Sequence, residues 1–217
     1  MSFIELDSIE FAYEDGMKVF SGFSAATECG TCTVLTGDNG SGKTTLLRIL
    51  TGLSFVQDGR YVFDGTEITA RFLRDNARSK LFHKRVGFLF QNPDVMLFNP
   101  KVYDEIAFGP RQMGLTDEET DRRVRDILEL FDIADLAERV PYHLSGGQKK
   151  KVALASVIAL DPEVLILDEP MSGLDRQSRS WHADFLTELK RAGRTLITAT
   201  HEPELIQNLA DQVIDLS

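Results

Sequence analysis

The sequence predicts an α/β protein built on a mostly parallel β-sheet. Short runs of apolar and β-branched residues are typical of parallel strands, which are covered on both faces. Stretches with helical spacing of apolar residues separate these runs, and this alternation favours a parallel sheet. The N-terminal segment instead alternates apolar and polar residues, as half-exposed antiparallel strands do. The predicted buried strands span residues 33–36, 86–90, 164–167 and 196–200.

The N-terminal segment predicts antiparallel strands over residues 3–6 and 9–13, followed by a hairpin turn at Asp15-Gly16. Tyr13 fits two roles equally well by position. Its ring could pack within the strand, or it could stack on a nucleotide base, a contact that contributes ~1–3 kcal/mol in nucleic-acid complexes.

Cys29 and Cys32 form a C-x-x-C pair in the turn that enters the first buried strand. Redox pairs of this spacing instead begin a helix after a strand. A single pair also cannot complete a zinc site. We therefore expect reduced, structural cysteines, as in a cytosolic protein.

Residues 37–44, Gly-Asp-Asn-Gly-Ser-Gly-Lys-Thr, match the pattern G-x-x-x-x-G-K-[S/T] at every position. The match lies between a predicted strand and a predicted helix that ends at Gly52, which is the context the pattern requires. Glycines let backbone N–H groups turn inward and form an anion site at the positive end of the helix. Lys43 suits the β- and γ-phosphates, and the Thr44 hydroxyl suits Mg²⁺. The segment therefore predicts a nucleoside triphosphate site.

A hairpin at 61–68, with its turn at Asp64-Gly65, is followed by a basic segment. This segment is either a contact patch or a solvated helix face, and the second interpretation is favoured. Its cations are Arg71, Arg74, Arg78, Lys80, Lys84 and Arg85.

Gln91 follows the strand at 86–90, which Pro93 ends. Open parallel sheets place ligand-binding groups at such strand tips. Residues 94–114 are predicted to be rich in loops, yet they contain apolar side chains such as Met96, Phe98 and Phe108. These side chains fit either a local core or a docking surface.

Two helices begin with clear capping signals. Thr116 and Glu119 form a capping box before an amphipathic helix. Pro141 then interrupts the chain before Leu-Ser-Gly-Gly-Gln at 144–148, where Ser145 is a suitable N-cap. This glycine-rich helix start predicts a second anion site.

Polar residues also follow the last two buried strands. Asp168 and Glu169 come after the run at 164–167, and two carboxylates at a buried strand tip are costly unless a metal or substrate uses them. His201 follows the run at 196–200. We expect these side chains to lie near Lys43 and Gln91, because the carboxyl ends of parallel strands share one edge.

The chain has 217 residues, which suits one domain, and 24 basic against 34 acidic residues give a net charge of −10. This charge disfavours a nucleic-acid surface. We expect neither a signal peptide nor a membrane span, because no apolar run approaches ~18 residues. A membrane role would require a partner.

The phosphate loop, Gln91, LSGGQ, LILDEP at 165–170, SGLD at 172–175 and His201 occur in the order and spacing of ABC-type ATPases. The chain resembles that family over almost its whole length. The run at 90–110 is similar to ATPases of energy-coupling-factor importers, which take up cobalt, nickel, biotin and other vitamins. The resemblance implies one ABC ATPase domain over 1–217. It would have a P-loop NTPase core with a mostly parallel sheet, an N-terminal antiparallel β subdomain, and a helical subdomain at about 92–160 carrying LSGGQ.

The resemblance also implies individual roles. Tyr13 would stack on adenine, Thr44 and Gln91 would ligate Mg²⁺, and Asp168 would hold a water of the metal. The implied catalytic residues are Glu169 as general base, His201 as the residue that contacts the γ-phosphate, and Gln91. The implied ATP-binding residues are Tyr13, Asn39, Gly40, Ser41, Gly42, Lys43, Thr44 and Thr45, with Ser145, Gly146, Gly147, Gln148 and Asp175 acting across a dimer.

The implied assembly is a head-to-tail dimer around two ATP molecules, with an identical copy or a close paralogue. Membrane subunits would bind residues 94–114, and the protein would be cytoplasmic on the inner face of the membrane, without nucleic acid. Met96 stands where the importer subgroup often has glutamine. Since the chain ends at Ser217, without the C-terminal domain of many relatives, we expect a monomer in the absence of nucleotide.

Three other functions compete with the importer. The chain could serve another type of ABC transporter. DNA-associated relatives insert a long coiled coil between Gln91 and the signature, whereas about fifty residues without heptads lie there in this chain. The acidic net charge also argues against this DNA-associated class. Translation-associated relatives carry two ABC ATPase domains in one chain.

Overall fold

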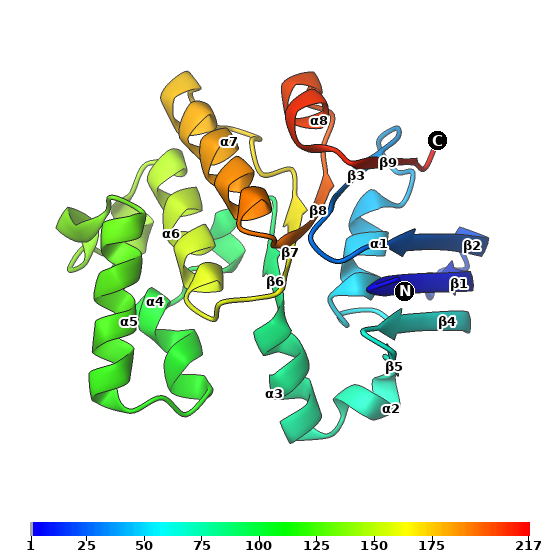
Figure 1. Ribbon diagram of the computed structural model, residues 1–217, viewed down its shortest axis with the longest axis horizontal. Helices are drawn as coiled ribbons and strands as arrows, with labels where there is room; N and C mark the ends of the chain where they lie inside the picture. The colour runs from blue at the N-terminus through cyan, green and yellow to red at the C-terminus, as the bar shows by residue number, and fades with distance from the viewer. Residues whose placement is uncertain (1) are drawn as a thin grey trace.

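A parallel sheet forms the centre of the protein, whose computed structural model describes residues 2–217 (Figure 1). Its strand order is β6-β7-β8-β3-β9, and every neighbouring pair is parallel. All carboxyl ends of the strands therefore meet at one edge. The prediction of a mostly parallel α/β core is confirmed. The strands are β3 (Cys32–Thr36), β6 (Val86–Leu89), β7 (Val164–Asp168), β8 (Thr195–Ala199) and β9 (Gln212–Asp215).

A second, antiparallel sheet has the order β2-β1-β4-β5, which confirms the predicted N-terminal antiparallel unit. The expected separate strands at 3–6 and 9–13 are one continuous strand. Its register shifts around Ser8, which has φ 50° and whose N–H donates to Ser24 Oγ at 2.8 Å, so pairing continues across the irregularity. The strands are β1 (Ile4–Ala12), β2 (Lys18–Thr27), β4 (Asp58–Phe63) and β5 (Thr66–Glu67).

Helices cover both faces of the parallel sheet (Figure 1). Helix α1 lies between the two sheets, and α4, α5 and α6 lie together on the far side of β6 and β7. The helices are α1 (Lys43–Leu50), α2 (Ala70–Leu73), α3 (Asn76–Arg85), α4 (Val102–Gln112), α5 (Asp117–Leu130), α6 (Gly146–Ile158), α7 (Arg176–Arg191) and α8 (Pro203–Leu209), with short 3₁₀ turns at Pro93–Val95, Ala134–Leu136 and Pro141–His143.

The expectation of a loop-rich stretch at 94–114 is wrong for half of that stretch, because α4 lies there. Gly109 and Pro110 have low helix propensity, so the sequence does not indicate this helix. Pro110 lacks the N–H that would bond to the carbonyl of Ile106, so the helix loses one hydrogen bond there and must be held by its packing. Val102, Ile106 and Pro110 are buried at a spacing of four residues, and this stripe holds the helix against its neighbours.

Two apolar cores share the parallel sheet. Leu165 and Leu167 face a core that includes α4, α5 and α6, whereas Val164 and Ile166 face a core that includes α1 and the antiparallel sheet. Successive side chains of a strand point to opposite faces, so one buried strand serves both cores. The continuous apolar run at 164–167 follows from this arrangement.

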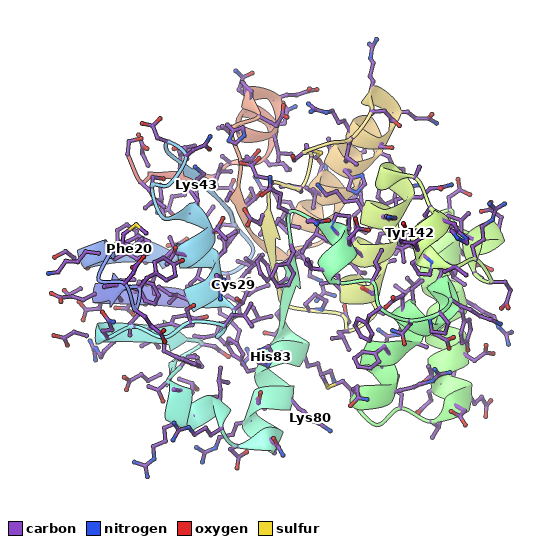
Figure 2. All side chains as sticks on the ribbon, turned by 180° about the vertical axis from the view of Figure 1, so that it is seen from behind. Phe20, Cys29, Lys43, Lys80, His83 and Tyr142 are labelled. Atoms are coloured by element: carbon purple, nitrogen blue, oxygen red, sulfur yellow. The ribbon has the colours of Figure 1, made fainter. Side chains whose placement is uncertain are left out.

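Cys29 is exposed and Cys32 is buried, and neither forms a disulfide. The predicted basic segment forms α2 and α3, where Lys80 and His83 lie well away from Lys43 (Figure 2). Arg85 is paired with Asp64 and Glu163, and the other five cations of the segment are exposed. Within residues 2–217, no helix has the length and apolar character needed to cross a membrane.

Candidate active site

The phosphate loop joins β3 to α1 through glycines with positive φ. Gly40 has φ 88° and Gly42, the N-cap of α1, has φ 101°. A Cβ atom on Gly42 would also lie 2.7 Å from Val19 Cγ1, so both the backbone conformation and the space require glycine. Gly37 has φ 132°, and its Cβ would meet Ser41 Oγ at 2.7 Å. The chain therefore wraps tightly around the start of α1.

Lys43 is the first residue of α1, and its side chain folds back into the loop. Its Nζ donates to the carbonyl oxygens of Gly37 at 2.6 Å and Asp38 at 2.9 Å. Lys43 is only 9% exposed. Since an ammonium group has three donors, the loop leaves one free for an anion.

Tyr13 lies at the turn of the β1–β2 hairpin and contacts the phosphate-loop helix. Its hydroxyl is hydrogen-bonded to Thr45 Oγ1 at 2.7 Å, and its ring meets Phe11 edge-on at 5.2 Å. The ring is 37% exposed, so part of its surface is open to a ligand. These contacts fix the ring beside the loop.

Thr44, Gln91 and Asp168 present oxygen atoms to the same cavity. Thr44 Oγ1 donates to Asp168 Oδ2 at 3.1 Å. Burial raises the pKa of Asp168, while the hydrogen bond from Thr44 and the charge of Lys43 oppose that shift. Residues 2–217 contain no cluster of three or more His, Cys, Asp or Glu side chains that could hold a metal alone. The donor set fits Mg²⁺, which prefers oxygen ligands and typically binds through one or two carboxylates together with substrate phosphates and water.

Glu169 follows β7 and adopts φ 45°, a conformation uncommon outside glycine. It is 7% exposed, and its Oε1 lies 2.9 Å from His201 Nδ1. This approach does not have hydrogen-bond geometry, so Oε1 has no hydrogen-bond partner within the described chain. Burial raises the pKa of Glu169, and the neighbouring His201 acts in the opposite direction. A carboxylate whose pKa is raised toward neutrality is better suited to accept a proton.

Most of the predicted site residues surround one cavity of about 330 Å³. They come from the β1–β2 hairpin, the phosphate loop, and the tips of β6, β7 and β8. Met17 and Val19, which sequence reasoning missed, line it as well. The hydrogen bond from Tyr13 N to Met17 O at 3.0 Å brings them there, and the hairpin signal at Asp15-Gly16 could have indicated this pairing. The predicted residues at this cavity are Tyr13, Asn39, Gly40, Gly42, Lys43, Thr44, Thr45, Gln91, Asp168, Glu169 and His201.

The signature residues lie elsewhere. Ser145 caps α6 in a capping box with Gln148, as predicted. Ser145, Gly147 and Gln148 line a separate groove along α7, and none of them reaches the phosphate-loop cavity. Asp175 caps the start of α7. Figure 2 shows Lys43 and Tyr142, which lies three residues before Ser145, on opposite sides of the molecule.

A sequence profile of the family described as ABC transporter matches residues 20–172. The nickel import ATP-binding protein LarO of Lactiplantibacillus plantarum is 46% identical over 213 residues, covering 97% of this chain and 87% of that protein. The nickel import ATP-binding protein NikO of Rhodobacter capsulatus is 46% identical over 215 residues, covering 98% and 84%.

A solved structure shows the same fold. The structure of cbiO1 from Clostridium perfringens, described as part of the ABC transporter complex cbiONQ, superposes with a TM-score of 0.86. It is 32% identical, and the match covers 99% of this chain and 84% of that chain. The predicted resemblance to ABC-type ATPases is confirmed. This chain belongs to the ABC transporter family of ATP-binding proteins.

Proposed function

We propose that this protein is the ATP-hydrolysing subunit of an energy-coupling-factor importer that takes up nickel or cobalt ions. The main support for the proposal is that the phosphate-loop residues and the signature residues lie at two separate places in one chain. The phosphate loop, Glu169 and His201 share one cavity, whereas the signature lines another. Two relatives that are 46% identical are nickel import ATP-binding proteins, which supports nickel or cobalt as the cargo.

The chemistry requires positioning and charge neutralisation more than covalent steps. Lys43 and the backbone N–H groups of the loop would bind the β- and γ-phosphates of ATP. Glu169 would accept a proton from the water that attacks the γ-phosphorus, and ADP would leave with the bridging oxygen. His201, 2.9 Å from Glu169, would contact the γ-phosphate and keep the carboxylate in place.

Thr44, Gln91 and Asp168 would hold Mg²⁺, with Asp168 acting through a water. The ion neutralises phosphate charge when bound. Asp168 is 6% exposed and is already oriented by Thr44, so the chain supplies a preformed side of this site.

A second copy would complete each site. In a head-to-tail dimer, Ser145, Gly146, Gly147 and Gln148 of one copy face the ATP on the phosphate loop of the other, and the Asp175 segments lie between the sites. The N-terminus of α6 suits this role, because its first N–H groups and the helix dipole attract phosphate. We propose that pairing requires ATP. Light scattering that detects a stable dimer without nucleotide would contradict this part of the proposal.

Residues 94–114 would bind the integral membrane subunits and place the protein on the cytoplasmic face of the membrane. Val95 and Phe98 are 65% and 67% exposed, and Phe98 stacks edge-on with the exposed Phe108 at 5.0 Å. Exposed apolar side chains that support one another are typical of a docking surface. Met96 is half-buried beside them.

Co-purification from native membranes tests the function, followed by uptake of radioactive nickel or cobalt into vesicles that contain the purified complex. Integral subunits should accompany the tagged protein, and uptake should require ATP. Phe98→Asp should abolish both co-purification and uptake. Leu130→Asp, at an exposed position on α5, is the matched control and should change neither. ATP hydrolysis that does not respond to nickel or cobalt, by a protein that brings no membrane subunits with it, would contradict the proposal.

A further inference from the structure

Lys150 is a buried lysine that the roles proposed above do not use. It lies on α6, within the helix that Ser145 begins, and it is 1% exposed. Its Nζ donates to the backbone carbonyl oxygens of Glu169 at 3.0 Å and Ser172 at 2.9 Å. Burial lowers the pKa of Lys150 to about 8. A buried ammonium is costly, so its few contacts must be well formed for the native state to keep it.

The two carbonyl groups are the first and last of a tight turn at 169–172. Ser172 N donates to Glu169 O at 3.1 Å and closes the turn. The φ of 45° at Glu169 is unfavourable for a residue other than glycine, and such conformations persist where surrounding contacts impose them. Lys150 bonds both ends of this turn. Together with the bond from Glu169 N to Ala199 O at 2.9 Å, it fixes the backbone that carries the Glu169 carboxylate.

The beginning of α6 is also packed against the beginning of α7. A Cβ atom on Gly147 would lie 2.4 Å from Ser178 Oγ, so the two helices approach closely there. Ser178 N in turn donates to Asp175 Oδ1 at 2.8 Å. The signature helix therefore contacts the segment from Glu169 to Ser178 at two places, through Gly147 and through Lys150.

We propose that Lys150 is a positioning residue for ATP hydrolysis. Its side chain connects the turn that carries Glu169 to the signature helix. This inference rests on the proposed function. In the proposed dimer, the signature of one subunit contacts one ATP molecule. Glu169 of the same subunit acts on the other ATP molecule. Lys150 joins those two elements within a subunit, so displacement of α6 at one site moves the general base of the other.

Lys150→Met tests the proposal, because it keeps the apolar length of the side chain and removes its donors. We expect kcat to fall about 10- to 100-fold, the loss that a misplacement of about 1 Å produces at a reacting group. The dissociation constant for ATP should stay within about twofold, because Lys150 does not touch the phosphate loop. Lys150→Gln keeps N–H donors on a shorter chain, and its kcat should fall about 3- to 10-fold.

Lys149→Met is the matched control, with the same change on the same helix. Lys149 pairs with Asp94 at 2.8 Å instead of with the turn. Its kcat should stay within about twofold of the wild-type value.

A Lys150→Met protein with wild-type kcat would overturn the inference. So would a loss of ATP affinity as large as the loss of kcat, since Lys150 would then act through the phosphate loop or the whole fold. If thermal melting shows that the Met variant is unfolded, Lys150→Gln decides, and a wild-type kcat in that variant overturns the inference. Glu169→Gln is measured alongside. Retained hydrolysis there contradicts the proposed function, whereas normal Lys150 variants beside an inactive Glu169→Gln contradict only this inference.

Discussion

The phosphate-loop half of the molecule and the signature half are built differently. The first half gathers buried ionisable groups at the edge of the parallel sheet, where Lys43, Asp168 and Glu169 are all less than 10% exposed. The second half exposes the start of one helix, with Ser145 and Gly146 open to solvent. In the phosphate-loop half, the sheet holds the charged groups in place. In the signature half, backbone N–H groups at the start of the helix face the solvent.

The proposed function assigns chemistry to the first half and recognition of ATP to the second, and the difference in burial fits this assignment. Groups that move protons or neutralise phosphate work best where water is scarce and their positions are fixed. A helix N-terminus needs no burial to attract an anion. In the proposed dimer, the exposed half of one copy would cover the buried half of the other.

Removing the proposed general base should give the largest effect. Glu169→Gln keeps the shape of the side chain but cannot accept the proton, so turnover should fall ~10²–10⁴-fold, the usual contribution of a positioned base. ATP binding should persist, as measured by equilibrium titration beside steady-state hydrolysis. Glu204→Gln, at an exposed position on α8, is the control. Near-normal hydrolysis by Glu169→Gln would exclude Glu169 from this role.

Blocking the signature should come next. Ser145→Arg places a long side chain where a partner's nucleotide would lie, and turnover should fall ~10²–10³-fold, as when a preorganised donor is lost. ATP binding to the single copy should not change. Ser145→Ala removes only the cap, at a cost of about 1 kcal/mol, and so separates loss of the cap from obstruction. Unchanged hydrolysis in Ser145→Arg would mean that the signature does not meet ATP.

The signature half should also be the more sensitive to acid. His182 on α7 is fully buried, its Nδ1 contacts Ser178 O at 2.9 Å, and its Nε2 has no partner within residues 2–217. Burial lowers the pKa of His182 to about 4, from 6.5. The unfolded chain therefore binds a proton on this histidine below pH 6.5, whereas the folded chain binds it only near pH 4. The free energy of unfolding therefore decreases as the pH falls across that window.

The expected loss between pH 6.5 and pH 5 is about 2 kcal/mol from this one group. Urea unfolding at both pH values measures it. His182→Phe cannot charge, so it should lose about 2 kcal/mol less than the wild type over the same interval. His143→Asn, at an exposed position, should behave as the wild type does. Equal losses in wild type and His182→Phe would refute the assignment.

Lys43→Ala should have the smallest effect of the three site substitutions. A charged hydrogen bond contributes roughly 1.5–3 kcal/mol, so ATP affinity should fall about 10- to 150-fold. Isothermal titration measures this loss. Arg48→Ala, an exposed position on the same helix, should bind ATP normally. Unchanged affinity in Lys43→Ala would contradict a phosphate contact.

Much of the phosphate-loop half could be predicted from the sequence, because its residues are adjacent in the chain or follow apolar strands. The buried strands are recognisable since both of their faces are covered. Helix α4 was missed because Gly109 and Pro110 are read as helix breakers. The propensity rules that identify breakers do not show that Val102, Ile106 and Pro110 are buried on one face, and this packing holds the helix despite the proline.

Lys150 could not be found from the sequence for a different reason. Residues 149–151 are three consecutive lysines, a run that is typical of a solvated helix face. The fold gives them different roles: Lys149 pairs with Asp94, Lys150 is buried against Glu169, and Lys151 lies over the Trp181 ring at 4.2 Å. Only the packing of α6 on its neighbours distinguishes these three.

Mixing two impaired variants, at an ATP concentration that saturates the wild type but not Lys43→Ala, tests the central claim most directly. Lys43→Ala has a damaged phosphate loop and an intact signature, whereas Ser145→Arg has the reverse. A mixed head-to-tail pair contains one intact site, so equal amounts should recover about a quarter of wild-type hydrolysis, since half of the pairs are mixed. If each copy held its ATP alone, the mixture would stay as inactive as its components, and the account would be wrong.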